Sequence, residues 1–140
     1  MKVEIVRIDK SLPLPEYKTE GAVAFDFCVR EETCIPAGKI VLVPTGVIVK
    51  VPDGFGLAVV ARSSTGRKKN ILVPFGLVDN DYYGPQDEIF IQAYNIGGED
   101  CVLHKGDRIA QGIFVRLAKA EWVEKKSTAK KQSRGSGSTG

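Results

Sequence analysis

Short runs of β-branched and aromatic residues recur along the chain, and they predict strands. These runs occupy residues 3–5, 40–43, 47–49, 55–59, 89–91 and 113–115. Pro, Gly and Asp residues stand between the runs, as in Pro52-Asp53-Gly54, and such residues favour turns. Many short strands separated by tight turns are typical of a β-sandwich or a β-barrel. The pattern therefore predicts an all-β fold.

The pattern predicts a single short helix in addition to the strands. Serine is favoured at helix starts, so we expect a helix directly after Arg62-Ser63-Ser64. No other window has the apolar period of a long amphipathic helix. Because there is no internal repeat and no second hydrophobic unit, we expect one β domain over residues 1–124 and a tail over residues 125–140.

The composition is that of one globular domain. The chain has 140 residues, of which 43% are hydrophobic and 26% are charged, and this length is enough to bury a core. No apolar run approaches the roughly 20 residues that cross a bilayer, and the N-terminus lacks a signal-peptide layout. Cys28, Cys34 and Cys101 form an odd set without Cys-x-x-Cys spacing. Reduced thiols in a cytoplasmic protein are the expected arrangement, without a membrane partner.

The net charge of +3 comes from the end of the chain. Residues 125–140 contain lysines, one arginine and many small polar residues, but no acid. Such a segment buries too little apolar surface to fold alone, so we expect a mobile tail that an anion orders. It has no aromatic residue to stack on bases, so a nucleic-acid partner is not expected.

The most informative segment for function is 76–84, where an apolar half-strand runs into Asp79, Asn80, Asp81 and Tyr82. Apolar neighbours can desolvate a carboxylate partly, and this tunes it towards general-base catalysis. The alternative is a hairpin in which Asn80 and Asp81 form only the turn.

Several other chemistries are excluded by residues that the chain lacks. His104 is the only histidine, so a multi-histidine metal site is impossible, and a strand-end surface position is expected for it. There is no phosphate-binding loop of the P-loop type. The segment Arg62-Ser63-Ser64-Thr65-Gly66 offers a cation, hydroxyls and exposed amides, and it predicts either an anion site or a plain helix cap.

Five segments occur in a fixed order and together resemble the motifs of the trimeric dUTPase family. They are residues 21–27, 61–66, 76–84, 106–111 and 134–140. The resemblance spans the chain from about residue 14 to residue 140. It implies a β jelly roll, a homotrimer with three sites at subunit interfaces, and Mg²⁺-dependent hydrolysis of dUTP to dUMP and pyrophosphate. This activity supplies dUMP and keeps uracil out of DNA.

The resemblance also assigns the residues of the reaction. Asp79 matches the residue that activates the water attacking the α-phosphorus. Ser63 matches the contact to the α–β bridging oxygen, with Ser64 and Thr65 beside it in the phosphate site. Arg62 would orient the catalytic carboxylate and support that site.

Magnesium and the phosphate chain are assigned in the same way. Asp26 matches the residue that holds Mg²⁺, mostly through water, while the substrate phosphates carry the ion. Gln111 matches a donor to the phosphate chain.

The nucleoside would be recognised by the third motif. The ring of Tyr82 would pack on the deoxyribose and exclude a 2′-hydroxyl. A hairpin from about Val73 to Asp79, including Gly76 and Val78, would read uracil through main-chain groups, because its side chains there are apolar.

The tail carries the last motif. Arg134, Gly137, Ser138 and Thr139 match residues that grip the phosphates over bound substrate. Ser136 stands where the family has a phenylalanine that stacks on uracil, so we expect the base to be less covered here.

Two other functions remain open at this point. The related dCTP deaminases share the fold, but Gln92 stands at the position of their catalytic glutamate, and an amide is no general base. The second alternative is a regulatory protein that binds dUTP without turnover.

Overall fold

The computed structural model describes residues 1–128, so the predicted contacts of Arg134, Ser136, Gly137, Ser138 and Thr139 lie outside the described residues. Short strands and a single helix make up the regular structure of this described part. In chain order the elements are β1 (Ile5–Arg7), β2 (Phe25–Phe27), β3 (Thr33–Ile35), β4 (Ile40–Pro44), β5 (Val47–Val49), β6 (Phe55–Ala61), α1 (Thr65–Lys69), β7 (Ile71–Leu72), β8 (Gly76–Val78), β9 (Phe90–Asn95), β10 (Cys101–Leu103) and β11 (Ala110–Arg116). The predicted all-β fold with one short helix is confirmed.

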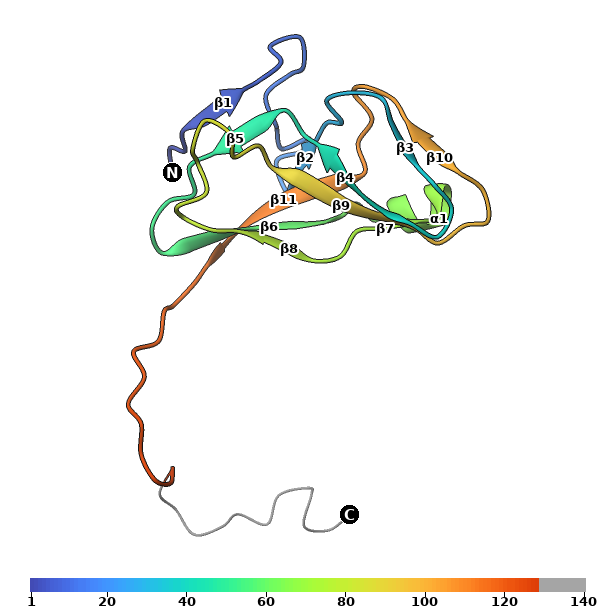
Figure 1. Ribbon diagram of the computed structural model, residues 1–140. Coiled ribbons are helices and arrows are strands. Elements are labelled where there is room, and N and C mark those ends of the chain that lie inside the picture. The colour runs from blue at the N-terminus through green and yellow to red at the C-terminus, as the bar shows by residue number, and fades with distance from the viewer. Residues whose placement is uncertain (129–140) are drawn as a thin grey trace, which may run out of the picture.

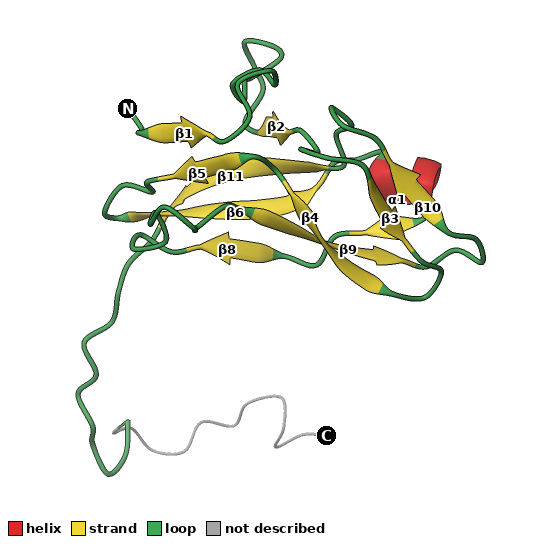
Figure 2. Ribbon diagram, turned by 45° about the horizontal axis from the view of Figure 1, so that its top comes forward, coloured by secondary structure: helices red, strands yellow, loops and turns green. Residues whose placement is uncertain are grey.

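The strands form four antiparallel sheets (Figures 1 and 2). The larger ones have the strand orders β2-β11-β6-β8 and β4-β9-β7, and the pairs β1-β5 and β10-β3 complete the body. Helix α1 lies at the end of the molecule that holds β3 and β10, while β1 lies at the opposite end. Strands β6 and β11 are the longest and run across the molecule between these ends.

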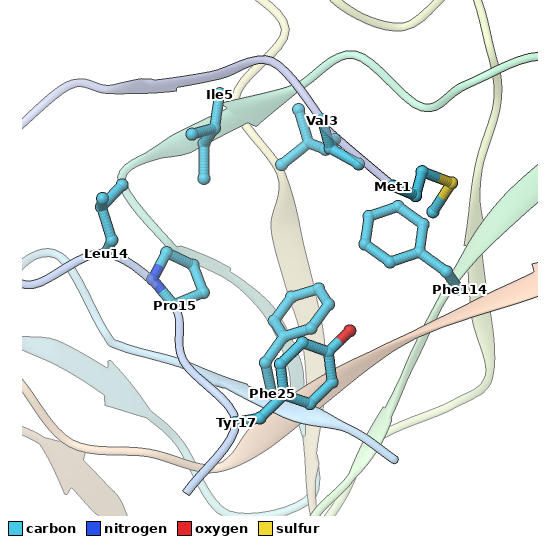
Figure 3. A pocket seen from close by; sticks show the side chains of 9 residues that line it. Met1, Val3, Ile5, Leu14, Pro15, Tyr17, Phe25 and Phe114 are labelled. Atoms are coloured by element: carbon cyan, nitrogen blue, oxygen red, sulfur yellow. The ribbon is translucent and has the colours of Figure 1, made fainter. Parts of the chain in front are cut away.

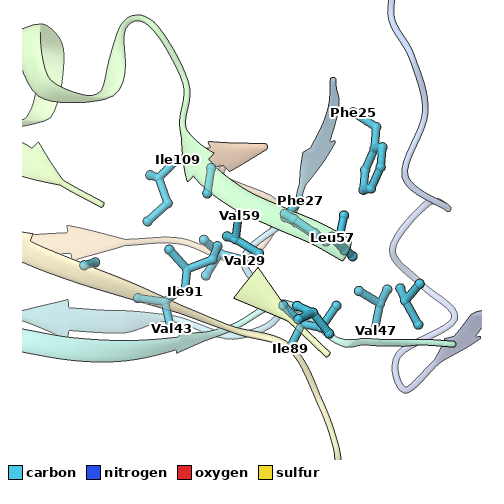
Figure 4. Packing of buried hydrophobic residues seen from close by; sticks show 14 of the residues in the cluster. Phe25, Phe27, Val29, Val43, Val47, Leu57, Val59, Ile89, Ile91 and Ile109 are labelled. Carbon is cyan, nitrogen blue, oxygen red and sulfur yellow. The ribbon is translucent and has the colours of Figure 1, made fainter. Parts of the chain in front are cut away.

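The core lies between the two larger sheets (Figure 4). Phe27 and Leu57 contribute from one sheet, and Val43 and Ile91 contribute from the other. Strand β2 shows how the sequence sets this arrangement, because Phe25 and Phe27 are buried while the residue between them is half-buried. Alternation of this kind places one face of a strand on the core and leaves the other for polar groups.

Helix α1 begins where the sequence predicts it, but the reason differs. Ser64 occupies the N-cap position and makes no capping hydrogen bond with its side chain. The buried hydroxyl of Thr65 donates instead to the carbonyl of Ile109, at 2.7 Å. This bond connects the start of α1 to the residue just before β11. The helix ends at Asn70, which has a φ of 55°.

The predicted hairpin over residues 73–79 is wrong. Strand β7, before this segment, pairs with β9, whereas β8, inside it, pairs with β6. The segment therefore passes from one sheet to the other instead of folding back on itself. The alternative hairpin with a turn at Asn80 and Asp81 is wrong as well, because β8 and β9 are not paired.

The chain leaves the body after β11 (Figure 1). Residues 117–128 contain neither helix nor strand, and Trp122 and Val123 are 90% and 75% exposed. The described residues include no helix of the length and apolar character needed to cross a membrane. Cys28, Cys34 and Cys101 are all free thiols, as predicted.

Candidate active site

The predicted site residues fall into two groups at different places in the fold. The first group, here called the strand-end cluster, consists of Asp26, Arg62, Ser63, Ser64 and Gln111. The ladder of β2, β11 and β6 explains the group, since Gln111 lies opposite both Asp26 and Val60. Arg62 directly follows β6 and Ser63 comes next, so these polar groups meet where β6 gives way to α1.

An ion pair holds the strand-end cluster together. Arg62 Nε lies 3.0 Å from Asp26 Oδ1, and its Nη1 donates to the carbonyl of Arg108 at 3.1 Å. The side chain of Asp26 is only 12% exposed, whereas that of Arg62 is 37% exposed. Gln111 Nε2 donates to the carbonyl of Ala61 at 3.1 Å. The cluster thus presents a cation and an amide that are already oriented by the fold.

The serines and the threonine of this segment differ in exposure. Ser63 is exposed and Ser64 is half-buried. Thr65 is 3% exposed and its hydroxyl is bonded inside the fold, so its side chain supports α1. Ser63 is the hydroxyl of the segment that solvent or a ligand reaches most readily.

The second group surrounds a cavity of about 320 Å³ between β8 and β9, here called the nucleoside pocket. Its lining is Leu42, Val59, Pro74, Gly76, Leu77, Val78, Tyr82, Ile89, Phe90 and Gln92. Gly76, Val78 and Tyr82 were predicted for this site. Val73 is the exception, because it packs against the core and does not line the pocket.

Asp79 is exposed and directly follows Val78, the last residue of β8 and part of the lining of the nucleoside pocket. Its carbonyl accepts a hydrogen bond from the amide of Tyr82 at 3.3 Å. The next residue, Asn80, is anchored by its side-chain amide, which donates to the carbonyls of Val51, Pro52 and Phe55 at 3.2, 2.8 and 2.8 Å. Asp79 therefore lies between Val78, which is held in β8, and Asn80, which is held by its side-chain hydrogen bonds.

Asp79 and Arg62 lie toward opposite ends of β6. Val78 pairs with Leu57, and Arg62 lies five residues further along the chain, so the separation along the strand is about 17 Å. Asp79 continues away from Arg62, since the strands are antiparallel. Within one chain Arg62 pairs with Asp26, and its predicted role in orienting the catalytic carboxylate stays a prediction.

Comparison with known proteins identifies the family of the chain. The dUTPase family model matches residues 10–140, which is nearly the whole chain. The chain belongs to the dUTPase family.

Curated members of the family match over their full length. A deoxyuridine 5′-triphosphate nucleotidohydrolase of Helicobacter pylori strain P12 is 36% identical over 142 residues, covering 100% of this chain and 95% of the relative. One from Hydrogenobaculum sp. is 36% identical over 145 residues, covering 100% and 99%.

Solved structures of dUTPases are also similar to this chain. The crystal structure of a dUTPase from Streptococcus mutans superposes with a TM-score of 0.79 at 36% identity, covering 87% of this chain and 100% of that one. A dUTPase mutant of Staphylococcus bacteriophage 80alpha, solved with dUpNHpp, shares the fold at 18% identity, with a TM-score of 0.86 and coverage of 96% and 94%.

A dUTPase site must also accommodate a metal, and the described residues fit only a particular kind. They contain no group of three or more His, Cys, Asp or Glu side chains able to hold an ion. Asp26 offers a single carboxylate, and Arg62 already pairs with it. Such a site is unsuited to a dedicated protein cage, but it fits a hydrated Mg²⁺ that arrives on the phosphates of a substrate.

The sequence reasoning missed two residues behind the nucleoside pocket. Glu88 is buried and pairs with Arg30, 58 residues away in the chain. The hydrogen-bonded carboxylate of Glu88 raises the pKa of the Arg30 guanidinium above its ordinary value. No local pattern links the two positions, so only the fold reveals this pair.

A further cavity lies at the β1 end of the molecule and has a different character (Figure 3). Its volume is about 430 Å³, and the side chains around it are apolar or aromatic, among them Val3, Leu14, Tyr17, Phe25 and Phe114. None of the predicted site residues lines it. An apolar hollow without a charged group is poorly suited to a triphosphate, so it is not the active site.

Proposed function

We propose that the chain hydrolyses dUTP to dUMP and pyrophosphate. The support is the full-length similarity to curated deoxyuridine 5′-triphosphate nucleotidohydrolases. The observation that carries the proposal is the pairing of a pocket of nucleoside size, rimmed by a carboxylate, with a separate polar cluster suited to phosphates. This reaction supplies dUMP and keeps uracil out of DNA.

The carboxylate of Asp79 takes the proton from the water that attacks the α-phosphorus. Its exposure at the pocket rim suits this role, because a general base must reach a water beside the substrate. Ser63 donates to the α–β bridging oxygen, on which the leaving-group charge develops. The ring of Tyr82 lies against the deoxyribose and leaves no room for a 2′-hydroxyl.

The strand-end cluster binds the phosphate chain. Arg62 supplies positive charge, and Gln111 supplies an amide donor from β11. Ser64 contributes its hydroxyl beside Ser63, while Thr65 supports the segment, because its amide donates to the carbonyl of Arg62 at 3.1 Å and its hydroxyl to that of Ile109. When Mg²⁺ is bound it neutralises phosphate charge, and Asp26 holds it through water.

Main-chain groups of residues 73–79 recognise uracil. The backbone of this segment crosses between sheets, so its amides and carbonyls are not all used by a ladder. Gly76 and Val78 present theirs to the nucleoside pocket, whose remaining lining is largely apolar. Val73 supports this backbone from the core side.

The active form is a homotrimer whose sites lie between chains. Asp79 and Arg62 of one chain are too far apart to act on the same phosphate, since their separation along β6 is about 17 Å. A second copy is the simplest source of the missing group. The exposed apolar side chains of Trp122 and Val123 also favour association, because such surfaces mark contact sites.

The tail completes the site. Arg134, Gly137, Ser138 and Thr139 grip the triphosphate, and Ser136 leaves the uracil face open. The enzyme acts in the cytoplasm without a nucleic-acid or membrane partner.

A pyrophosphate-release assay with dUTP and Mg²⁺ tests the proposal. Rapid release is expected. Tight binding of dUTP without release would instead indicate a regulatory binder, and ammonia released from dCTP would indicate a deaminase. The latter is opposed by Gln92, which lines the pocket with an amide where a deaminase needs a base.

A further inference from the structure

A buried charge lies directly behind the nucleoside pocket. Glu88 is 7% exposed and is the only charged side chain among the buried residues that the structure describes. It immediately precedes Ile89 and Phe90, both of which line the pocket. Burying a carboxylate is costly unless it is fully paired, so its partners require an explanation.

Both oxygens of Glu88 are engaged. Arg30 Nε lies 2.9 Å from Oε2 and Arg30 Nη2 lies 3.0 Å from Oε1, which is a bidentate pair. The amide of Gly46 donates to Oε2 at 2.9 Å. Gly46 has a φ of 73°, and its open Cα lets the aliphatic part of Arg30 pack against it. The ion pair thus joins the loop before β9 to the segment between β2 and β3, and the Gly46 amide joins the same carboxylate to the turn between β4 and β5.

The backbone reinforces this junction. The amide of Ile89 donates to the carbonyl of Val47 at 2.9 Å, and the hydroxyl of Thr45 donates to the carbonyl of Ile89 at 2.6 Å. Glu88 and Ile89 are therefore fixed relative to the β4–β5 turn by both side-chain and main-chain bonds.

Tyr82 is attached to the same fixed point. Its hydroxyl donates to the carbonyl of Glu88 at 3.1 Å, while its amide donates to the carbonyl of Asp79. Tyr82 is 38% exposed, so solvent reaches part of its surface. A ring held at both ends has a defined plane, whereas a half-exposed ring held only at its backbone is free to rotate.

We propose that the Arg30–Glu88 ion pair is a positioning element for sugar selection, which acts by fixing the hydroxyl end of Tyr82 at the wall of the nucleoside pocket. The inference rests on the proposed function, because it gives Tyr82 the task of excluding a ribose. Arg30 and Glu88 touch no substrate. The ion pair fixes the main-chain carbonyl of Glu88, and this carbonyl accepts the hydrogen bond from the Tyr82 hydroxyl. The ring of Tyr82, held in this way, excludes the 2′-hydroxyl.

The test compares hydrolysis of dUTP and UTP by full-length variants. Glu88→Gln keeps the shape and removes the charge, Arg30→Lys keeps the charge and removes the fork, and Tyr82→Phe removes only the tethering hydroxyl. Glu31→Gln is the matched control, since Glu31 is exposed and also contacts Arg30, at 3.5 Å. Molar mass and urea unfolding are measured for each variant.

We expect Glu88→Gln and Arg30→Lys each to lower the ratio of kcat/KM for dUTP to that for UTP by about 10- to 100-fold, the effect of a small misplacement. The ratio should fall mainly because kcat/KM for UTP rises, since a ring that is free to rotate no longer excludes the 2′-hydroxyl. Tyr82→Phe should act in the same direction, and the Glu88→Gln/Tyr82→Phe double variant should lose no more selectivity than the larger single effect. Glu31→Gln should leave the ratio unchanged.

A merely structural pair would lower the free energy of unfolding and leave the selectivity ratio intact. Folded Glu88→Gln with an unchanged ratio would overturn the inference, and where that variant does not fold, Arg30→Lys decides in the same way. Additive effects in the double variant would also overturn it. Wild-type protein that does not hydrolyse dUTP at all would instead defeat the proposed function, and this inference with it.

Discussion

At the scale of single residues, the position of the general base is the first matter to test. Asp79 and Asp81 are both exposed carboxylates in the same loop. Asp79→Asn should lower kcat by roughly 10²–10⁴-fold while dUTP still binds, because the amide keeps the shape and cannot accept the proton. Asp81→Asn should retain most of the turnover. Steady-state pyrophosphate release measures both, and the opposite ranking would mean that Asp81 is the base.

Asn80 gives a second test at this scale. Its side-chain amide bonds to three carbonyls around the turn before β6. Asn80→Ala should reduce the free energy of unfolding by about 1–3 kcal/mol, because these carbonyls lose their donor. Urea denaturation measures the change, with Gln86→Ala, an exposed residue of the same loop, as the control. Equal stability of the two variants would show that water replaces the amide at no cost.

The sequence could predict site residues only where they are close together in the chain. Asp79 and Tyr82 lie in one short motif, and the structure places Tyr82 in the lining of the nucleoside pocket and Asp79 next to Val78 of the same lining. Glu88 and Arg30 are 58 residues apart, and neither has a distinctive neighbourhood. Their pairing depends on how the segment between β2 and β3 packs on the loop before β9, and the hydrophobic periodicity carries no information about that packing.

At the scale of elements, the hydrophobic pattern predicts where strands occur in the sequence, but it does not predict which strands pair with each other. Alternation around Phe25 and Phe27, and the apolar run that became β6, follow directly from burial of one face. The run predicted at residues 89–91 overlaps β9, which extends from Phe90 to Asn95 with every second residue buried, including the polar Asn95. Partners were not predictable, since β7 and β8 lie four residues apart and belong to different sheets.

Strand β11 offers a test of element packing. A Cβ added at Gly112 would come within 2.6 Å of the ring of Phe25 and 3.0 Å of the ring of Phe27. Gly112→Ala should therefore destabilise the protein by about 1–3 kcal/mol through overpacking between β11 and β2.

The control for this change is Gly98→Ala, because a Cβ at Gly98 meets nothing within 4 Å. Its free energy of unfolding should differ from that of the wild type by less than about 0.5 kcal/mol. Thermal and urea denaturation of both variants measure the contrast. A Gly112→Ala protein as stable as the control would mean that β2 shifts to make room.

At the scale of the whole molecule, the separation of the two groups of site residues is the decisive feature. Asp79 lies at one end of β6 and Arg62 lies beyond the other, so the proposed site takes these two groups from different chains. Asp79→Asn and Arg62→Gln should each be nearly inactive alone. When equal amounts are unfolded together and refolded, chains assort at random, and about one quarter of the sites regain both intact groups.

The measurement is pyrophosphate release after mixing, compared with each variant refolded alone, with light scattering to confirm trimers in all samples. Recovery of about one quarter of the wild-type rate is expected, since each restored site takes Asp79 from one chain and Arg62 from another. Because Arg62 pairs with Asp26, Arg62→Gln also requires a check of its unfolding curve. No recovery from well-folded mixed trimers would show that one chain carries both groups of a site, and would contradict the interface arrangement.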